Sequence, residues 1–338
     1  MRSNRTSSER NLLLLRPVII ITLLNIAIMV TDGQKPLLTH GLLPADGSRN
    51  QLGLDDSNEV INLNTDLVSV AVTVTDREGR AIAGLPRESF RIFDDKVERP
   101  ISFFSEEDTP ASVGIVFDTS GSMDEAAMQR AREALSGFIE TSHPQDEFSV
   151  IGFGSSPQLL LDRVRDGKAV LDKFTYVNTT GNTALYDAVY MGVEKVSHGV
   201  YPKHAIVLIS DGEENNSRCS FSKLRRTLEE SGVVVYTVRV GKHPLPKSIG
   251  GMVMDQIAAT SGGKSFWPKN SESMDQAFEQ IALELRRQYS IGYIPTNFAA
   301  DGKLHKIKVA LTVPRALSRD MVVRHREGYY AVAKLATR

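Results

Sequence analysis

Cysteine is almost absent from this chain of 338 residues, in which Cys219 is the only one. A single thiol cannot close an internal disulfide, and the seven histidines show no spacing typical of zinc or iron–sulfur ligands. Disulfide scaffolds and zinc fingers are therefore excluded. The chain also lacks an excess of charge, because 40 Lys and Arg residues balance 41 Asp and Glu residues to a net charge of −1. No nucleic acid is expected among the partners, since nothing in this balance favours a surface that binds phosphates.

Long apolar runs are also scarce, and the longest lies near the N-terminus. It extends over 12–30, is interrupted by Arg16 and Pro17, and follows several arginines. As a helix, 17–30 is roughly 21 Å long, shorter than the ~30 Å hydrocarbon core of a bilayer. The pattern predicts an export signal over 1–30, either cleaved or retained as an N-terminal anchor. We therefore expect an exported protein of the periplasm, cell envelope or extracellular space, with membrane contact only through this segment if it is uncleaved.

The composition and periodicity of the sequence change several times after this segment. Residues 31–58 are rich in Gly, Pro, Asp and Asn and predict a linker. Alternating apolar and polar residues indicate strands over 59–107 and again over 290–335. Each of these β segments is too short to form a stable sheet domain alone. We therefore expect them to pair as two halves of one small β-sandwich-like domain, with 108–289 inserted between them.

The inserted part alternates short apolar runs with amphipathic helical patterns, which is typical of a doubly wound, mostly parallel sheet. Strands are predicted at 112–117, 148–153, 205–209, 233–240 and 264–267. Helices are predicted at 124–141, 183–197, 221–231, 253–260 and 274–289. The predicted fold class is therefore α/β.

Oxygen-bearing side chains occur in three loops of this part, at Asp118, Ser120, Ser122, Thr183 and Asp211. Loops at the carboxyl ends of parallel strands meet at one edge of the sheet, where such folds bind ligands. Gly121 is expected to let the first loop curl without a Cβ clash. Carboxylate and hydroxyl oxygens favour a hard cation, Mg²⁺ first and Mn²⁺ or Ca²⁺ after it. Because only two carboxylates are present, an open position of the ion should favour an Asp or Glu carboxylate of a partner protein.

Each of these residues also has a purely structural explanation. Ser122 and Glu125 form a capping-box pattern, Thr183 can cap the helix after it, and Asp211 can serve in a turn. Taken singly, Ser122 is better explained as a cap. Taken together, five oxygen ligands on three converging loops favour the metal site.

These residues resemble the von Willebrand factor type A domain with its metal-ion-dependent adhesion site. The segment Asp118-Thr119-Ser120-Gly121-Ser122 is similar to the DxSxS element, Thr183 to the separate threonine, and Asp211 to the second aspartate. The resemblance covers about 111–289 and implies a six-stranded doubly wound sheet, in which hydroxyl residues bind the metal directly and aspartates often bind through water. The flanking β segments resemble the bacterial, acidobacterial-type branch of this family, whose members are mostly exported.

The sequence thus favours a non-catalytic, divalent-metal-dependent protein-binding or adhesion module of the cell envelope. No pair of nucleophile and base and no phosphate-binding glycine loop lies near the site, so the protein is not expected to be an enzyme. Two alternatives stay open. One is a metal-dependent hydrolase of phosphate or ester bonds. The other is an envelope scaffold whose metal is structural and whose β domain makes the functional contact.

Overall fold

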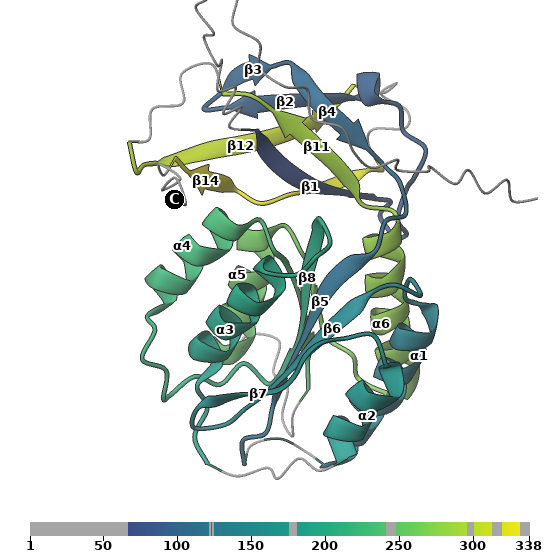
Figure 1. Cartoon of the computed structure of the whole chain (residues 1–338), viewed down its shortest axis with the longest axis vertical. Coiled ribbons are helices and arrows are strands. Elements are labelled where there is room, and N and C mark those ends of the chain that lie inside the picture. The colour runs from purple at the N-terminus through teal and green to yellow at the C-terminus, as the bar shows by residue number, and fades with distance from the viewer. Residues whose placement is uncertain are drawn as a thin grey trace, which may run out of the picture. The chain divides into compact units, whose positions relative to one another are not determined.

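The computed structural model describes residues 67–121, 123, 125–175, 181–240, 248–295, 301–312 and 320–331. The predicted export signal, the predicted linker and Ser122 lie outside these residues. Within them, no helix combines the length and the apolar character that a membrane span requires. The strands of the described chain form three sheets, one of six strands and two of four (Figure 1).

The six-stranded sheet has the order β10-β9-β8-β5-β6-β7. Its strands are β5 (Ala111–Asp118), β6 (Glu147–Phe153), β7 (Pro157–Val164), β8 (Lys203–Ser210), β9 (Val234–Arg239) and β10 (Ser265–Phe266). All neighbouring strands pair parallel except β6 and β7, which pair antiparallel. Every residue of β5, β6 and β9 is buried, which explains why these strands are apolar runs without alternation.

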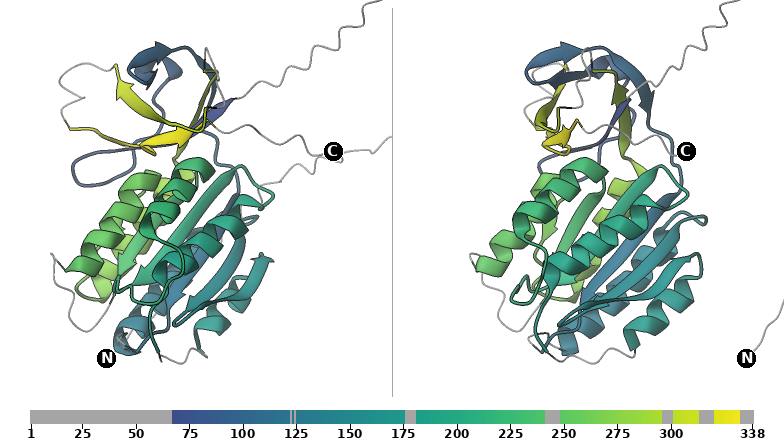
Figure 2. Two further views of the ribbon diagram at one scale, coloured as in Figure 1. Left: turned by 90° about the vertical axis from the view of Figure 1, so that its left-hand side faces the viewer. Right: turned by 60° about the vertical axis from the view of Figure 1, so that its left-hand side comes forward.

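Helices cover both faces of this sheet (Figures 1 and 2). They are α1 (Glu125–Thr141), α2 (Gly167–Thr175), α3 (Leu185–Ser197), α4 (Phe221–Ser231), α5 (Ile249–Ser261) and α6 (Ser271–Arg286). The side chains of α1, α2 and α6 pack with Phe117 and its neighbours, whereas those of α3, α4 and α5 pack with Val116. Successive residues of β5 therefore point to opposite helix layers. The predicted doubly wound, mostly parallel α/β sheet is confirmed.

Several element boundaries differ from those predicted. Strand β7 and helix α2 were not predicted, because β7 is a largely exposed edge strand with irregular burial. Helix α3 begins at Leu185 rather than at 183. Helix α5 begins at Ile249, before two glycines that conceal its first turn in the sequence, and the Ser248 side chain caps it. Helix α6 ends at Arg286, so Tyr289 belongs to a strand and not to the apolar stripe of the helix.

The two segments that flank the α/β part pair with each other in two antiparallel sheets. One has the order β13-β1-β11-β4 and the other β14-β12-β2-β3. The strands before the α/β part are β1 (Val68–Thr75), β2 (Phe90–Asp94), β3 (Val97–Arg99) and β4 (Ile101–Ser105), with the short 3-10 helix η1 (Arg87–Ser89). Those after it are β11 (Tyr289–Tyr293), β12 (Leu304–Leu311), β13 (Val322–Arg324) and β14 (Gly328–Tyr330). Each sheet therefore contains strands from both segments.

One hydrophobic core joins these two sheets. Val70 and Ile291 contribute from the first sheet, and Ile92 and Val309 from the second. The aromatic rings add to the contact, because the Phe90 and Tyr289 centroids lie 4.8 Å apart. The alternation of β1 places its valines at 68, 70, 72 and 74 in this core, as the sequence pattern predicts.

Candidate functional site

The first loop of the predicted metal site begins where β5 ends, at the buried residue Asp118. The next residue, Thr119, donates two hydrogen bonds to the carbonyl oxygen of Phe153, from its amide at 2.6 Å and from its hydroxyl at 2.9 Å. These bonds hold the loop against the end of β6. The amide of Ser120 donates a 2.8 Å bond to Oδ1 of Asp118. The carboxylate of Asp118 is thus fixed by the backbone that follows it.

The second loop, after β8, lies against the same carboxylate. The hydroxyl of Ser210 donates a 2.7 Å hydrogen bond to Oδ2 of Asp118 and accepts one of 3.0 Å from the amide of Gly212. Between them, Asp211 is partly buried, and its Oδ1 accepts a 2.9 Å bond from the amide of Glu213. The loops after β5 and β8 therefore meet at the carboxyl edge of the sheet.

The third loop of the predicted metal site carries Thr183, which is buried. Its amide donates a 2.9 Å bond to Oδ1 of Asn215, and its carbonyl accepts bonds from the amides of Asn215 and Asn216 at 3.0 and 3.1 Å. The amide of Ala184 donates a 2.8 Å bond to the carbonyl of Gly154, just after β6. Thr183 is not the N-cap of α3, which is Ala184. Its structural explanation as a helix cap is therefore wrong.

Hydrogen bonds thus connect the loops that carry four of the predicted ligands, Asp118, Ser120, Thr183 and Asp211. The fifth, Ser122, lies outside the described residues. Sequence reasoning missed Ser210 and Asn215, which join the loops to one another. Their proximity to Asp211 in the sequence is the only local signal, because their bonding partners are distant in the chain.

The electrostatics of Asp118 suit a cation. The pKa of this carboxyl is raised to about 6, first by burial and then by the nearby charge of Asp211, while hydrogen bonds from Ser120 and Ser210 oppose the change. In the described part of the chain, no Lys or Arg charge is among the main influences on this pKa. Two carboxylates beside buried hydroxyls and no cationic side chain form a donor set that fits a divalent hard cation.

The position that requires glycine in these loops is not the one that the sequence predicts. Gly121 does not adopt a left-handed backbone conformation, and a Cβ added there would meet no atom of the described residues within 4 Å. The expected need for glycine at this position is wrong. Gly212 has φ +87°, and a Cβ there would collide with the carbonyl of Gly250 at the start of α5. The glycine that the site requires is therefore the one after Asp211.

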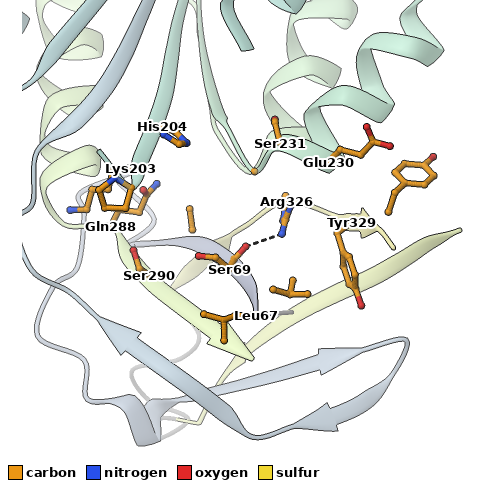
Figure 3. A pocket seen from close by; sticks show the side chains of 15 residues that line it. Leu67, Ser69, Lys203, His204, Glu230, Ser231, Gln288, Ser290, Arg326 and Tyr329 are labelled. Carbon is orange, nitrogen blue, oxygen red and sulfur yellow. Dashed lines mark hydrogen bonds between the residues drawn. The ribbon is translucent and has the colours of Figure 1, made fainter. Parts of the chain in front are cut away.

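A cavity of about 350 Å³ lies at the other end of β8, near Lys203 and His204 (Figure 3). Arg326 points into this region and donates a 2.8 Å bond to the carbonyl of Ser69. Burial lowers the pKa values of Lys203 and His204, which favours their neutral forms. This cavity is remote along the strand from Ser210 and takes no part in the predicted metal site.

The fold and these loops define the central part of the chain as a doubly wound α/β domain with an oxygen-rich carboxyl edge. The family model of the von Willebrand factor type A domain matches residues 113–214, and the chain contains a domain of this family. The match confirms the resemblance predicted from the sequence at the level of the domain. Such a domain is a protein-interaction module.

Two relatives match this chain over about half of its length. It is 26% identical over 178 residues to an uncharacterised protein of Synechocystis sp., an alignment that covers 51% of this chain and 41% of that protein. It is 24% identical over 203 residues to a UPF0353 protein of Mycolicibacterium paratuberculosis, with 52% and 61% covered. The alignments therefore span less than two thirds of either relative.

Among solved structures, a von Willebrand factor type A protein from Catenulispora acidiphila is similar to this chain. The two are 14% identical, with 80% of this chain and 75% of that chain covered and a TM-score of 0.46.

Proposed function

We propose that the protein is a non-catalytic module that binds a partner protein through a divalent ion at the carboxyl edge of the six-stranded sheet. The observation that carries the proposal is Asp118, a buried carboxylate that lies beside Asp211. A buried negative charge without a cation is costly, so a bound ion is the natural compensation. Mg²⁺ is the expected ion, with Mn²⁺ or Ca²⁺ as replacements.

The residues that would hold the ion are Asp118, Ser120, Thr183 and Asp211, together with Ser122 on the sequence pattern. When bound, the ion supplies a positive charge that an anionic oxygen can approach. Because the protein offers only two carboxylates, the site barely neutralises the charge of the ion and leaves no excess negative charge to repel an anionic ligand. The ligand we propose is therefore an Asp or Glu carboxylate of a partner protein.

We place this interaction outside the cytoplasm, because the basic and apolar pattern of residues 1–30 favours export. Fractionation of cells that produce the full chain tests the location. Recovery of the protein in the cytoplasmic fraction alone would contradict it.

The binding proposal is tested by capture of partners from envelope extract on the immobilised full chain, with Mg²⁺ and again with EDTA. We expect a partner that is retained with Mg²⁺, released by EDTA and lost in Asp118→Ala and Thr183→Ala. Asp172→Ala is the matched control, because this carboxylate is half exposed on α2 and pairs only with Lys168 in the described chain. Capture that survives both EDTA and Asp118→Ala would contradict the proposal. Metal-dependent turnover of phosphoesters, lost in Asp118→Ala, would replace it with the hydrolase alternative.

A further inference from the structure

A second group of possible metal ligands lies in the antiparallel sheets, far along the chain from the proposed ion site. It consists of Asp94, the last residue of β2, Asp95 in the turn to β3, and His305 in β12 (Figure 1). One ligand atom from each residue lies within 4.8 Å of the other two. In the part of the chain that the structure describes, no other group of three His, Cys, Asp or Glu residues meets this condition.

Asp94 is a buried carboxylate, and one of its two oxygens has no hydrogen-bond donor among the described residues. The residue is 3% exposed and follows Phe90 and Ile92 on the buried face of β2. Its Oδ2 accepts a 3.1 Å hydrogen bond from the hydroxyl of Tyr329. Its Oδ1 is buried and has no hydrogen-bond partner among the described residues. A buried oxygen of this kind costs free energy unless a donor or a cation reaches it.

His305 is held between two carboxylates. Its Nδ1 lies 2.9 Å from Oδ2 of Asp95, and its Nε2 lies 3.4 Å from Oδ1 of Asp301. Its ring also stacks on Tyr329 with the centroids 5.3 Å apart. Histidines that bind metals commonly present one ring nitrogen to the ion and donate the other N–H to a carboxylate, which fixes the ring. Asp301 stands in that second position.

The position of Asp95 completes the arrangement. Its Oδ1 accepts a 2.9 Å bond from the amide of Lys306, which leaves Oδ2 facing His305. Two ligand atoms at about 2.1 Å from a tetrahedral ion are about 3.4 Å apart. The 2.9 Å between Nδ1 and Oδ2 is a hydrogen-bond distance, so these atoms need to separate by about 0.5 Å to share one ion.

We propose that Asp94, Asp95 and His305 bind a divalent transition metal, with Zn²⁺ preferred, and that Asp301 positions His305. An imidazole with two carboxylates suits Zn²⁺, whereas Mg²⁺ and Ca²⁺ favour sites made of oxygen alone. The side chain of His305 is 23% exposed and that of Asp95 53%, so water can complete the coordination. The ion would join the turn after β2 to β12, two parts of the chain some 210 residues apart.

This site is independent of the one under Proposed function, because the two use different residues on different sheets. The competing explanation needs no metal, since a protonated His305 can form ion pairs with Asp95 and Asp301. The two explanations differ in what they predict for Zn²⁺. Ion pairs alone give no uptake of the ion and no change of stability when it is added.

The test is equilibrium dialysis of the full chain against Zn²⁺, with thermal unfolding followed in parallel. We expect one ion per chain, a higher Tm in its presence, and an affinity that falls by about tenfold or more in His305→Gln and in Asp95→Asn. Asp118→Ala should leave this binding unchanged, which separates it from the proposed adhesion site. His198→Gln is the matched control, because the ring of this exposed histidine bonds only to the carbonyl of Glu194 among described residues.

Two results would overturn the proposal. One is the absence of Zn²⁺ uptake when the free ion is raised to about 100 µM. The other is uptake that His305→Gln and Asp95→Asn leave intact, which would place the ion elsewhere. Both variants alter partly exposed side chains, and circular dichroism of each variant checks that it folds.

Discussion

Ser210 donates a 2.7 Å hydrogen bond to the carboxylate of Asp118, from the end of one parallel strand to the end of its neighbour. A bond of the same kind and length lies at the opposite edge of the same sheet, where the hydroxyl of Ser112 donates to Oε1 of Glu147. Both pairs are buried. Only the first involves a proposed metal ligand, so the two serines offer a matched comparison.

We expect Ser210→Ala to weaken binding of Mg²⁺ or Mn²⁺ by about tenfold, because the carboxylate of Asp118 loses the group that orients it. Ser112→Ala should leave metal affinity unchanged. Each variant should lose about 1–2 kcal/mol of unfolding free energy, since each removes one buried bond to a carboxylate. Titration calorimetry and urea unfolding measure the two quantities. Equal metal affinities in the two variants would show that Ser210 does not support the site.

Two glycines in the proposed metal loops should respond in opposite ways to alanine. Gly212→Ala forces a side chain into a left-handed conformation and against the carbonyl of Gly250, so we expect a loss of about 2 kcal/mol or more and weaker metal binding. Gly121→Ala meets open space and should change stability by less than about 0.5 kcal/mol. Urea unfolding of both variants tests the pair. If Gly121→Ala lost as much unfolding free energy as Gly212→Ala, this prediction would be contradicted.

Arg326 connects the α/β part to the antiparallel sheets. It is 8% exposed, and its guanidinium donates 2.8 Å bonds to the carbonyls of Glu229 at the end of α4 and of Ser69 in β1. We expect Arg326→Met to lose about 3 kcal/mol of unfolding free energy, because two charge-assisted bonds from a buried guanidinium disappear. Lys168→Met, at an exposed ion pair on α2, should lose less than about 0.5 kcal/mol. Similar losses in both would contradict this assignment.

His325 should make stability depend on pH. Its Nδ1 donates a 2.7 Å bond to the carbonyl of Arg326, and its Nε2 accepts a 3.1 Å bond from the amide of Val309. Burial lowers the pKa of this imidazole in the folded protein below its usual value of 6.5, so the neutral ring is favoured. Its contribution to stability is complete above about pH 6.5 and is lost as the pH falls, by at most about 1.4 kcal/mol per pH unit.

The measurement is urea unfolding of the wild type and of His325→Gln between about pH 7.5 and pH 5.5. The glutamine carbonyl can still accept the bond from Val309, but it does not titrate. The wild type should therefore lose more stability than the variant over this interval. Parallel curves would mean that protonation of His325 is not linked to folding.

The sequence was a good guide to the elements that are buried on both faces. The apolar runs of β5 and β8 predicted strands of a parallel sheet, because a strand covered on both faces needs no polar alternation. It was a poor guide to β7, whose exposed edge position leaves no clear period. It also misplaced the end of α6, since Tyr289 continues the helical spacing of apolar residues but pairs with Val72 in a sheet. For a single buried aromatic residue, periodicity alone cannot distinguish the end of a helix from the start of a strand.

In the candidate site, too, some features could be predicted from the sequence and others could not. Asp118, Thr183 and Asp211 could be predicted because each lies where a strand ends or a helix begins, and such positions meet at one edge of the sheet. The Ser210 hydroxyl bond and the two bonds between Thr183 and Asn215 could not, because they depend on the path of loops that fold against each other. Sequence spacing also gave the histidines no role, whereas His305 lies beside Asp95.

The amino-acid sequence by itself determined the α/β class, the family of the central domain and the loops that carry the proposed oxygen ligands. These features follow from local periodicity and from residue types at strand ends. Only the tertiary structure decided how the flanking segments share two sheets, which hydroxyl orients Asp118, and which carboxylates surround His305. These features depend on pairing between strands that are distant in the chain, and the register of such pairing is set by the packing of the whole core.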